Sequence, residues 1–280
     1  MLVVIDSGNY STKYFFRNKE KTMQMGNFLS VSHDYVPFLE SAFSRGTNGI
    51  KRIQFYGADF YVGDGCVDLF LSKKDEKMFT GNVRKGHAHS LVRVVASLHE
   101  VYKISQENSF DVIITSPIKS CTLDKAYFTE ALLGEKAAIV NDTSFAFSIH
   151  SVTIAAEGLG ATAFVDKKNH IIVDAGSHTT NILRIVQGDM TANSETLNGG
   201  TQTKSAAQIA QTVFRSISDV DFEFPIRVTG GKSTDVAQAL AATGYTNCES
   251  VSANGCEPFY MNGYGVFLLA EEMEKEKLHG

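Results

Sequence analysis

Leu2-Val3-Val4-Ile5-Asp6-Ser7-Gly8-Asn9-Tyr10-Ser11-Thr12-Lys13 opens the chain, and the same design returns in Ile171-Ile172-Val173-Asp174-Ala175-Gly176-Ser177-His178-Thr179-Thr180-Asn181. Each stretch is an apolar run typical of a buried strand, followed by an aspartate, a glycine turn and small hydroxyl or amide residues. An aspartate at the rim of a sheet can order water around Mg²⁺, and a glycine lets backbone amides approach a polyphosphate closely. One copy alone also fits an ordinary β-hairpin with an Asx turn. Two copies favour a nucleotide clamp, whose halves we name loop 1 (residues 6–13) and loop 2 (residues 174–181).

The composition fits two globular domains. The chain has 280 residues, 43% of them hydrophobic, which is enough for a large core. Its net charge of −5 combines both signs without a sustained basic block, so we expect no direct nucleic acid or membrane partner. No apolar run approaches the ~20 residues of a membrane span, and the first strand lacks the features of a signal peptide. We therefore expect a cytoplasmic protein.

Periodicity in the first half predicts strands alternating with helices. Strands are expected at 2–6, 12–17, 53–62 (a hairpin turning at Gly57-Ala58), 111–116 and 138–140, and helices at 91–102 and 123–133. The segment Asn141-Asp142-Thr143-Ser144 is expected to start another helix that continues through Phe147, and Asp142 or Thr143 can simply cap it. The charged run at 73–77 is expected to be a solvated loop. For His87-x-His89 we favour a loop entering a helix over a metal site, because no third ligand has suitable spacing.

The second half repeats the opening of the first. Strands are expected at 161–165, 171–173 and 181–186, with a turn at Gln187-Gly188-Asp189, and again at 226–229. Asn198-Gly199-Gly200-Thr201 precedes a predicted helix whose apolar face is Ala206, Ile209, Ala210, Val213 and Ile217. Gly230-Gly231 follows the last strand, and such a turn lets a flat ring lie against the backbone. A closing helix from Asn262 is expected to pack back on the first domain.

The order of these motifs resembles the actin, Hsp70 and sugar-kinase superfamily over nearly the whole chain. The resemblance implies an α/β, actin-like fold of two ribonuclease-H-like domains flanking a nucleotide cleft. It assigns residues 1–150 and 258–280 to domain I, with a small β-rich subdomain at about 20–88, and residues 151–257 to domain II. Loops 1 and 2 then resemble the two phosphate loops, and Gly230-Gly231 resembles the adenosine loop.

Within this superfamily the chain is most similar to the bacterial plasmid-segregating actins, the ParM/Alp family. Three features carry this resemblance: Asp6-Ser7-Gly8-Asn9, Thr115-Ser116-Pro117 and Asn262-Gly263. In addition, the interval from Gly200 to Gly230 has room for only one helix and one short strand. The subdomain called IIB therefore looks absent, which resembles the compact AlfA subgroup.

This resemblance implies an ATPase that polymerises with ATP into dynamic filaments and segregates plasmid DNA, with hydrolysis timing filament disassembly. The implied cofactors are ATP or ADP, with GTP also open, and Mg²⁺. The implied partners are further copies of the chain and a DNA-binding adaptor protein on plasmid DNA.

The resemblance also implies roles for individual residues. Asp6 and Asp174 would hold Mg²⁺ through water, Asp174 would be catalytic, and Asp142 would orient or polarise the attacking water. The expected nucleotide-binding residues are Asp6, Gly8, Asn9, Lys13, Gly176, Ser177, Thr179, Gly199, Gly200, Gly230, Gly231 and Lys232. Three residues depart from the family pattern: His178 replaces a common glycine, Asn181 replaces a common acidic residue, and Asp142 is one methylene shorter than the glutamate of many relatives.

Two other functions stay open. The opening Val3-Val4-Ile5-Asp6-Ser7-Gly8-Asn9 also resembles type III pantothenate kinases, which are small-molecule kinases of the same superfamily. A second alternative is a nucleotide-binding scaffold that does not hydrolyse its ligand, which the departures at His178 and Asn181 would permit.

Overall fold

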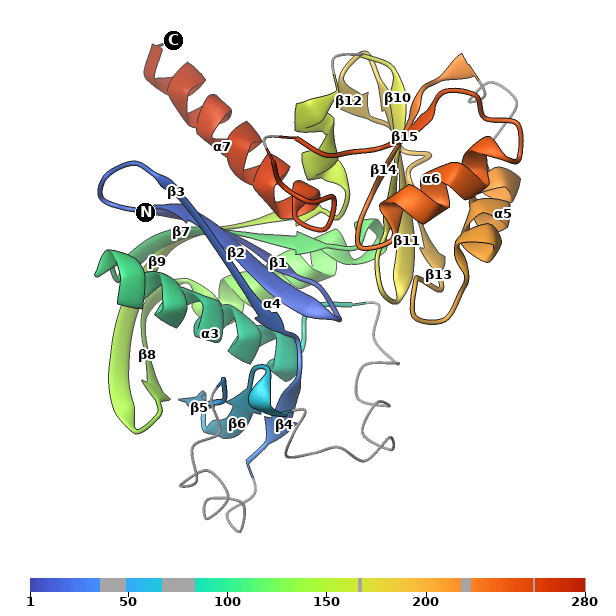
Figure 1. Ribbon diagram of the computed structural model, residues 1–280. Helices are drawn as coiled ribbons and strands as arrows, with labels where there is room; N and C mark the ends of the chain where they lie inside the picture. Colours follow the sequence, from blue (N-terminus) through green and yellow to red (C-terminus); the bar gives the residue numbers. More distant parts are fainter. Residues whose placement is uncertain (36–48, 67–83, 166–167, 218–222, 254, 280) are drawn as a thin grey trace. The chain divides into compact units, whose positions relative to one another are not determined.

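The computed structural model describes residues 1–35, 49–66, 84–165, 168–217, 223–253 and 255–279 (Figure 1). The chain divides into two compact units. Unit 1 comprises Met1–Ile114 and Thr122–Ile154, and unit 2 comprises Thr115–Cys121 and Ala155–Gly280. None of the helices in the described ranges combines the length and the apolar character that crossing a membrane requires.

A nine-stranded sheet forms the centre of unit 1, in the order β3-β2-β1-β7-β9-β8-β5-β6-β4. Its strands are β1 (Leu2–Ser7), β2 (Ser11–Arg17), β3 (Met23–Leu29), β4 (Ser32–Asp34), β5 (Lys51–Phe55), β6 (Ala58–Val62), β7 (Ser109–Ser116), β8 (Gly134–Val140) and β9 (Thr143–Ala156). β1 pairs antiparallel with β2 and parallel with β7. Loop 1 contains the turn that joins β1 to β2, so it lies at one end of these strands.

Helices α3 (Ala88–Ser105) and α4 (Cys121–Leu132) complete the core of unit 1. The predicted stripe on α3 is confirmed, because Leu91, Val94, Val95, Leu98 and Val101 are all buried. α3 packs on β1 and β2, the strands that carry loop 1. His87 caps α3 by accepting a hydrogen bond from the Ser90 amide.

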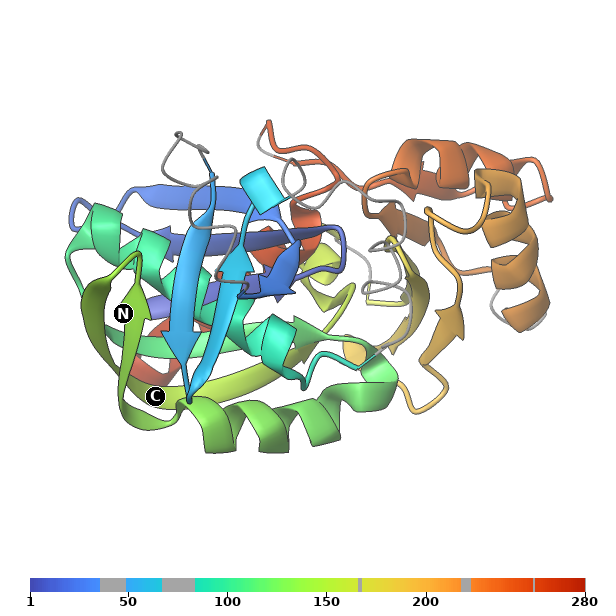
Figure 2. The same ribbon diagram turned by 90° about the horizontal axis from the view of Figure 1, so that it is seen from below.

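The hairpin predicted at 53–62 is confirmed, with β5 and β6 paired side by side (Figure 2). β3, β4, β5 and β6, which fall in the region expected to form a small β-rich subdomain, belong to the same sheet as β1. The run at 73–77 lies outside the described residues.

The helix predicted from Asn141 is wrong. Asn141 and Asp142 form the turn of the β8–β9 hairpin, with φ of 48° and 62°. These two residue types tolerate positive φ better than most, and the turn type that joins antiparallel strands tightly requires it. Beyond the turn, Phe145, Phe147 and Ile149 are buried at every second position, which is the period of a strand.

Unit 2 contains a six-stranded sheet in the order β12-β11-β10-β14-β15, with β13 also paired to β11. Its strands are β10 (His170–Ala175), β11 (Thr179–Val186), β12 (Asp189–Met190), β13 (Glu195–Asn198), β14 (Ile226–Thr229) and β15 (Cys248–Ser250). Its helices are the short 3₁₀ helices η3 (Ile118–Ser120) and η4 (Leu159–Phe164) and the α-helices α5 (Ala206–Ser216), α6 (Ser233–Ala241) and α7 (Met261–His279). α5 and α6 lie side by side in this unit (Figure 1).

The strand predicted at 161–165 is also wrong, because these residues belong to η4 and its end. η4 is held against α7: the Asn262 side-chain oxygen accepts hydrogen bonds from the amides of Gly158 and Gly160, at 2.9 and 3.4 Å. A Cβ atom at Gly160 would lie 1.8 Å from the Asn262 carbonyl oxygen, so only glycine permits this approach. Tertiary packing therefore overrides the apolar pattern here.

The closing segment differs from its expected place. We expected residues 258–280 with domain I, but α7 packs on η4 and both belong to unit 2. Between Gly200 and Gly230 the described residues contain α5 and β14, the one helix and one short strand expected from the length of the interval.

Candidate functional site

Loop 1 brings Asp6 and Lys13 together across the β1–β2 pair. The two residues face each other in the register, and the Lys13 ammonium lies 2.9 Å from the Asp6 carboxylate. Both side chains are buried. A Cβ atom at Gly8 would lie 2.7 Å from the Ser11 carbonyl oxygen and 3.9 Å from the Lys13 ammonium. Glycine therefore permits the tight turn, and it places the ammonium beside the loop backbone.

Loop 2 has the same design in unit 2, where Asp174 and Asn181 face each other across β10 and β11. The backbone oxygens of Gly176 and Ser177 accept hydrogen bonds from the amides of Thr201 and Gln202, at 2.9 and 3.0 Å. A Cβ atom at Gly200 would lie 2.3 Å from the Gly176 oxygen. The structure thus brings Gly176 and Ser177 together with the Gly199-Gly200 turn, although more than 20 residues separate them in the sequence.

The Gly199-Gly200 turn is fixed from both sides. Gly199 has a φ of +90°, its amide donates to the His178 oxygen at 3.0 Å, and its own oxygen accepts from the Thr180 hydroxyl at 3.0 Å. The hydrogen bond to Gly199 uses only the backbone of His178, so it does not require the glycine that is common at this position in the family. Thr179, at the start of β11, is buried.

Glu157 joins this group, although the sequence analysis did not select it. The Asn181 amide nitrogen donates to Glu157 Oε2 at 3.0 Å and approaches Asp174 Oδ2 at 3.5 Å. The Asn181 oxygen accepts from the Thr196 hydroxyl at 2.7 Å. This amide orientation is assigned from the network, since the flipped amide would turn an oxygen toward two carboxylates. Asn181 consequently fixes the positions of two buried acidic side chains.

The position of Glu157 follows from β9. Its amide donates to the Ser116 oxygen at 2.8 Å, directly after β9 and at the end of β7. A signal for it was present in the sequence, because Ile154-Ala155-Ala156-Glu157-Gly158 repeats the order of apolar residues, acid and glycine seen at Asp6 and Asp174. The incorrect helix at 141–147 concealed this third copy, since it removed the strand that precedes Glu157.

Asp142 lies at the other end of the same strand. Its side chain is 85% exposed and lies 3.8 Å from the Arg52 guanidinium. β9 has 14 residues, so about 45 Å of strand separates Asp142 from Glu157. The hairpin turn replaces the predicted helix, so Asp142 stands in an exposed turn before β9, whereas Glu157 directly follows β9.

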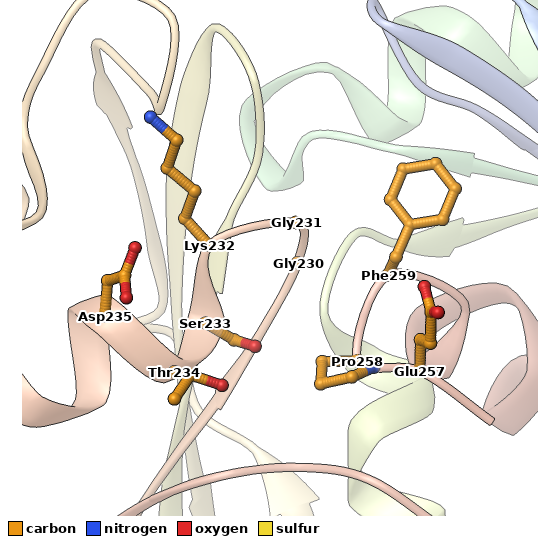
Figure 3. A pocket seen from close by; sticks show the side chains of 9 residues that line it. All are labelled: Gly230, Gly231, Lys232, Ser233, Thr234, Asp235, Glu257, Pro258 and Phe259. Carbon is orange, nitrogen blue, oxygen red and sulfur yellow. The ribbon is translucent and has the colours of Figure 1, made fainter. Parts of the chain in front are cut away.

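A pocket of about 210 Å³ in unit 2 contains the predicted adenosine residues (Figure 3). Residues 230–235 and Glu257-Pro258-Phe259 line it. Gly230 has a φ of +102°, and a Cβ atom there would lie 2.4 Å from the Ala175 oxygen, so the turn requires glycine. Its amide and the Thr229 hydroxyl both donate to the Pro258 oxygen, at 3.3 and 3.1 Å. These bonds hold the two walls of the pocket together.

The side chains around this pocket are of several kinds. The Phe259 ring stands on the opposite side of the glycine turn from Lys232, and the hydroxyls of Ser233 and Thr234 point toward Pro258 (Figure 3). The Lys232 ammonium lies 3.4 Å from the Thr201 oxygen, which links the pocket to the turn after Gly200. The pocket residues that the sequence analysis did not select are 233–235 and 257–259, and nothing in the composition of 257–259 distinguishes them from a loop.

The acidic residues fit a magnesium ion that arrives with a polyphosphate. In the described ranges no group of three or more histidine, cysteine or acidic side chains is arranged to hold a metal. Mg²⁺ typically uses one or two carboxylates, several waters and the phosphates of a substrate, and it seldom occupies a cage made only by protein. Asp6 near the end of β1 in unit 1 and Asp174 near the end of β10 in unit 2 are each carboxylates of this kind.

Comparisons with known proteins identify relatives over the full length of the chain. A family model described as the N-terminal domain of actin-like proteins matches residues 4–160. A filament structure of AlfA bound to AMPPNP is 35% identical, with a TM-score of 0.90, and the match covers 99% of this chain and 98% of that chain. The AlfA filament structure from B. subtilis plasmid pLS32 is 36% identical, with a TM-score of 0.87 and coverage of 95% and 98%.

ParM of Bacillus thuringiensis with ATP shares the fold at 14% identity, with a TM-score of 0.65 and coverage of 97% and 99%. No curated protein matches the chain. These matches confirm the actin-like fold and the similarity to the compact AlfA subgroup that the sequence motifs indicated. The chain belongs to the family of actin-like proteins.

Proposed function

We propose that this protein binds Mg-ATP, assembles with further copies of itself into filaments, and hydrolyses ATP to time their disassembly. The observation that carries the proposal is the buried network in which Asn181 positions Glu157 beside Asp174. A scaffold that only binds a nucleotide has no need for a second oriented carboxylate at this place. Hydrolysis needs such a carboxylate, because an attacking water must be held and deprotonated.

Each loop has a distinct part in this function. The backbone amides around Gly8 and Gly176, together with Lys13, bind the phosphates of ATP. Asp6 and Asp174 would hold Mg²⁺ through water, and the ion would neutralise charge on the phosphates. Glu157 takes the role first given to Asp142, and it accepts a proton from the attacking water. Its hydrogen bond from Asn181 fixes the carboxylate in one orientation.

The pocket at residues 230–235 and 257–259 is proposed to receive the nucleoside. Glycine at 230 and 231 leaves the backbone open to a flat base, and Phe259 supplies an aromatic surface. Lys232, Asp235 and Glu257 offer polar groups for the ribose or the base. Most of these groups lie on the segments after β14 and before α7, so the pocket does not depend on a IIB subdomain.

The proposal of self-assembly rests on the relatives. Two AlfA structures, each matched over 98% of its chain at 35% and 36% identity, are filaments. By extension from that similarity, we propose that the filament moves plasmid DNA through a DNA-binding adaptor in the cytoplasm. The mixed charge of the chain supports an adaptor, since direct DNA binding depends on a concentrated basic surface.

Light scattering and phosphate release, followed together after Mg-ATP is added to the purified protein, test the proposal. We expect scattering to rise, phosphate to follow, and scattering to fall as ATP is used up. With Mg-AMPPNP the scattering should rise and persist. Phosphate transfer only after an acceptor such as pantothenate is added would instead favour the kinase, and binding without any hydrolysis would favour the scaffold.

A further inference from the structure

Lys85 is a buried lysine that lies beneath loop 1. It is 1% exposed and precedes α3. Its main chain is held by α4: the amides of Lys85 and Gly86 donate to the two carboxylate oxygens of Asp124, at 2.9 and 2.8 Å. Asp124 is itself fully buried. The backbone of Lys85 is therefore anchored, and its side chain extends from a fixed point.

The ammonium of Lys85 donates to the Ser7 carbonyl oxygen at 2.7 Å and lies 3.5 Å from the Asn9 side-chain oxygen. The neighbouring carbonyl groups of the loop are held by Ser30, whose hydroxyl donates to the Gly8 oxygen and whose amide donates to the Tyr10 oxygen. Ser30 is fixed in turn by Arg93 of α3, which donates to the Ser30 oxygen at 2.9 Å. Lys85 and Ser30 thus hold three carbonyl groups of the loop, those of Ser7, Gly8 and Tyr10.

The direction of each anchored carbonyl group determines the direction of the amide that follows it. In a trans peptide the carbonyl group and the following N–H point to opposite sides. When the Ser7 oxygen faces Lys85, the Gly8 amide faces away from it, and when the Gly8 oxygen faces Ser30, the Asn9 amide also faces away. In the described part of the chain, neither of these two amides donates to a protein acceptor. Adjacent amides that point outward form a concave site for anions.

We propose that Lys85, together with Ser30, is a positioning residue for loop 1, which turns the amides of Gly8 and Asn9 toward the phosphates of the bound nucleotide. This inference rests on the proposed function, since it assumes that loop 1 receives a polyphosphate. In this proposal Lys85 acts without touching the nucleotide, because its side chain is buried and its ammonium binds the Ser7 carbonyl. Its effect is transmitted through the Ser7 carbonyl, so it differs from Lys13, whose ammonium lies beside the loop.

The test is the Lys85→Met variant, which keeps the length of the side chain and removes the charge. Lys125→Met is the matched control, because Lys125 is an exposed lysine of α4, the helix that anchors Lys85. Affinities for Mg-ATP, Mg-ADP and adenosine are measured by competition against a fluorescent ATP analogue. Folding of each variant is checked by thermal unfolding.

We expect Lys85→Met to weaken Mg-ATP and Mg-ADP binding by about 10- to 100-fold, the usual effect of losing a charge-assisted hydrogen bond. Adenosine binding should change by less than about twofold, because adenosine has no phosphate for loop 1. A general loss of structure would weaken all three ligands equally, and this result would overturn the proposal. Unchanged ATP affinity in a folded Lys85→Met variant would also overturn it.

Ser30→Ala decides the matter if Lys85→Met fails to fold. It removes the hydroxyl that holds the Gly8 carbonyl and contacts the Thr12 hydroxyl at 2.8 Å, and it should weaken ATP binding but not adenosine binding. Equal effects on both ligands, or no effect on either, would contradict the proposal. The proposed function fails separately: in that case the parent protein itself shows no nucleotide binding, whatever the variants do.

Discussion

Replacing Glu157 by Gln tests the catalytic part of the proposal, because the change removes a charge and preserves the shape. Glu157 is 7% exposed, and its Oε2 atom accepts the 3.0 Å hydrogen bond from Asn181. The oxygen of a Gln side chain can accept the same bond, so folding and ATP binding should stay close to those of the parent. A neutral amide cannot take a proton from water, however.

The size of the effect follows from that loss. A positioned general base typically contributes ~10²–10⁴-fold to a rate, which corresponds to about 3–5 kcal/mol of activation free energy. We therefore expect Glu157→Gln to release phosphate at least about 100-fold more slowly than the parent. Filaments should still form with Mg-ATP and should persist much longer, since disassembly is proposed to follow hydrolysis.

The assay is phosphate release from Mg-ATP under conditions in which all the protein is assembled, with light scattering recorded in parallel. Asp142→Asn is the matched control. Asp142 is an exposed carboxylate in the turn before β9, whereas Glu157 follows β9, and Asn tolerates the φ of 62° in that turn. This control should hydrolyse ATP within about twofold of the parent. Parent-like hydrolysis by Glu157→Gln, or a large loss in Asp142→Asn, would refute the assignment.

Three further predictions concern the metal, the packing and the pH dependence. Asp174→Ala should abolish phosphate release, as measured with Mg-ATP, because it removes a carboxylate proposed to hold Mg²⁺; release at the parent rate would exclude that role. Gly265→Ala should lower the free energy of unfolding in urea by about 3 kcal/mol, because its Cβ would lie 1.8 Å from an oxygen of η4. Gly188→Ala, in an open turn, should cost only about 1 kcal/mol, and equal losses would contradict the packing. Burial, aided by Arg93, lowers the pKa of His87 to about 4. Because the pKa of His87 is lower in the folded chain than in the unfolded chain, the unfolded chain binds a proton at a pH at which the folded chain does not. The contribution of His87 to the free energy of unfolding is therefore fully present above about pH 6.5 and declines as the pH falls toward 4. His87→Asn keeps a side chain that can cap α3 and should reduce the loss of stability between pH 7.5 and pH 5 by about 1 kcal/mol, allowing for solvent screening; an unchanged pH profile would show that His87 does not titrate in this way.

The sequence predicted those elements whose local pattern agrees with their packing. The stripe on α3 has one apolar face at helical spacing, and that face is the one buried. Loops 1 and 2 were predicted because strand, acid and glycine stand next to one another in the chain. Their glycines are needed for local reasons, such as the approach of Gly8 to the Ser11 oxygen.

The failures have two causes: contacts that are distant along the chain, and residue types that suit more than one local structure. η4 was mistaken for a strand because the approach of Gly160 to Asn262 spans 102 residues. The turn at Asn141-Asp142 was mistaken for a helix start, since both residue types favour caps and tight turns equally well. The wrong helix also hid the strand that precedes Glu157. Lys85 gave no signal, because its contact with the Ser7 carbonyl joins segments 78 residues apart.

Electron microscopy of the purified protein in negative stain, with and without Mg-ATP, tests the central claim most directly. The parent protein should form filaments with Mg-ATP and none without a nucleotide, and Asp174→Ala should form far fewer under the same conditions. Absence of filaments from the parent at tens of micromolar protein, or equal filaments with and without nucleotide, would contradict the claim that ATP drives assembly.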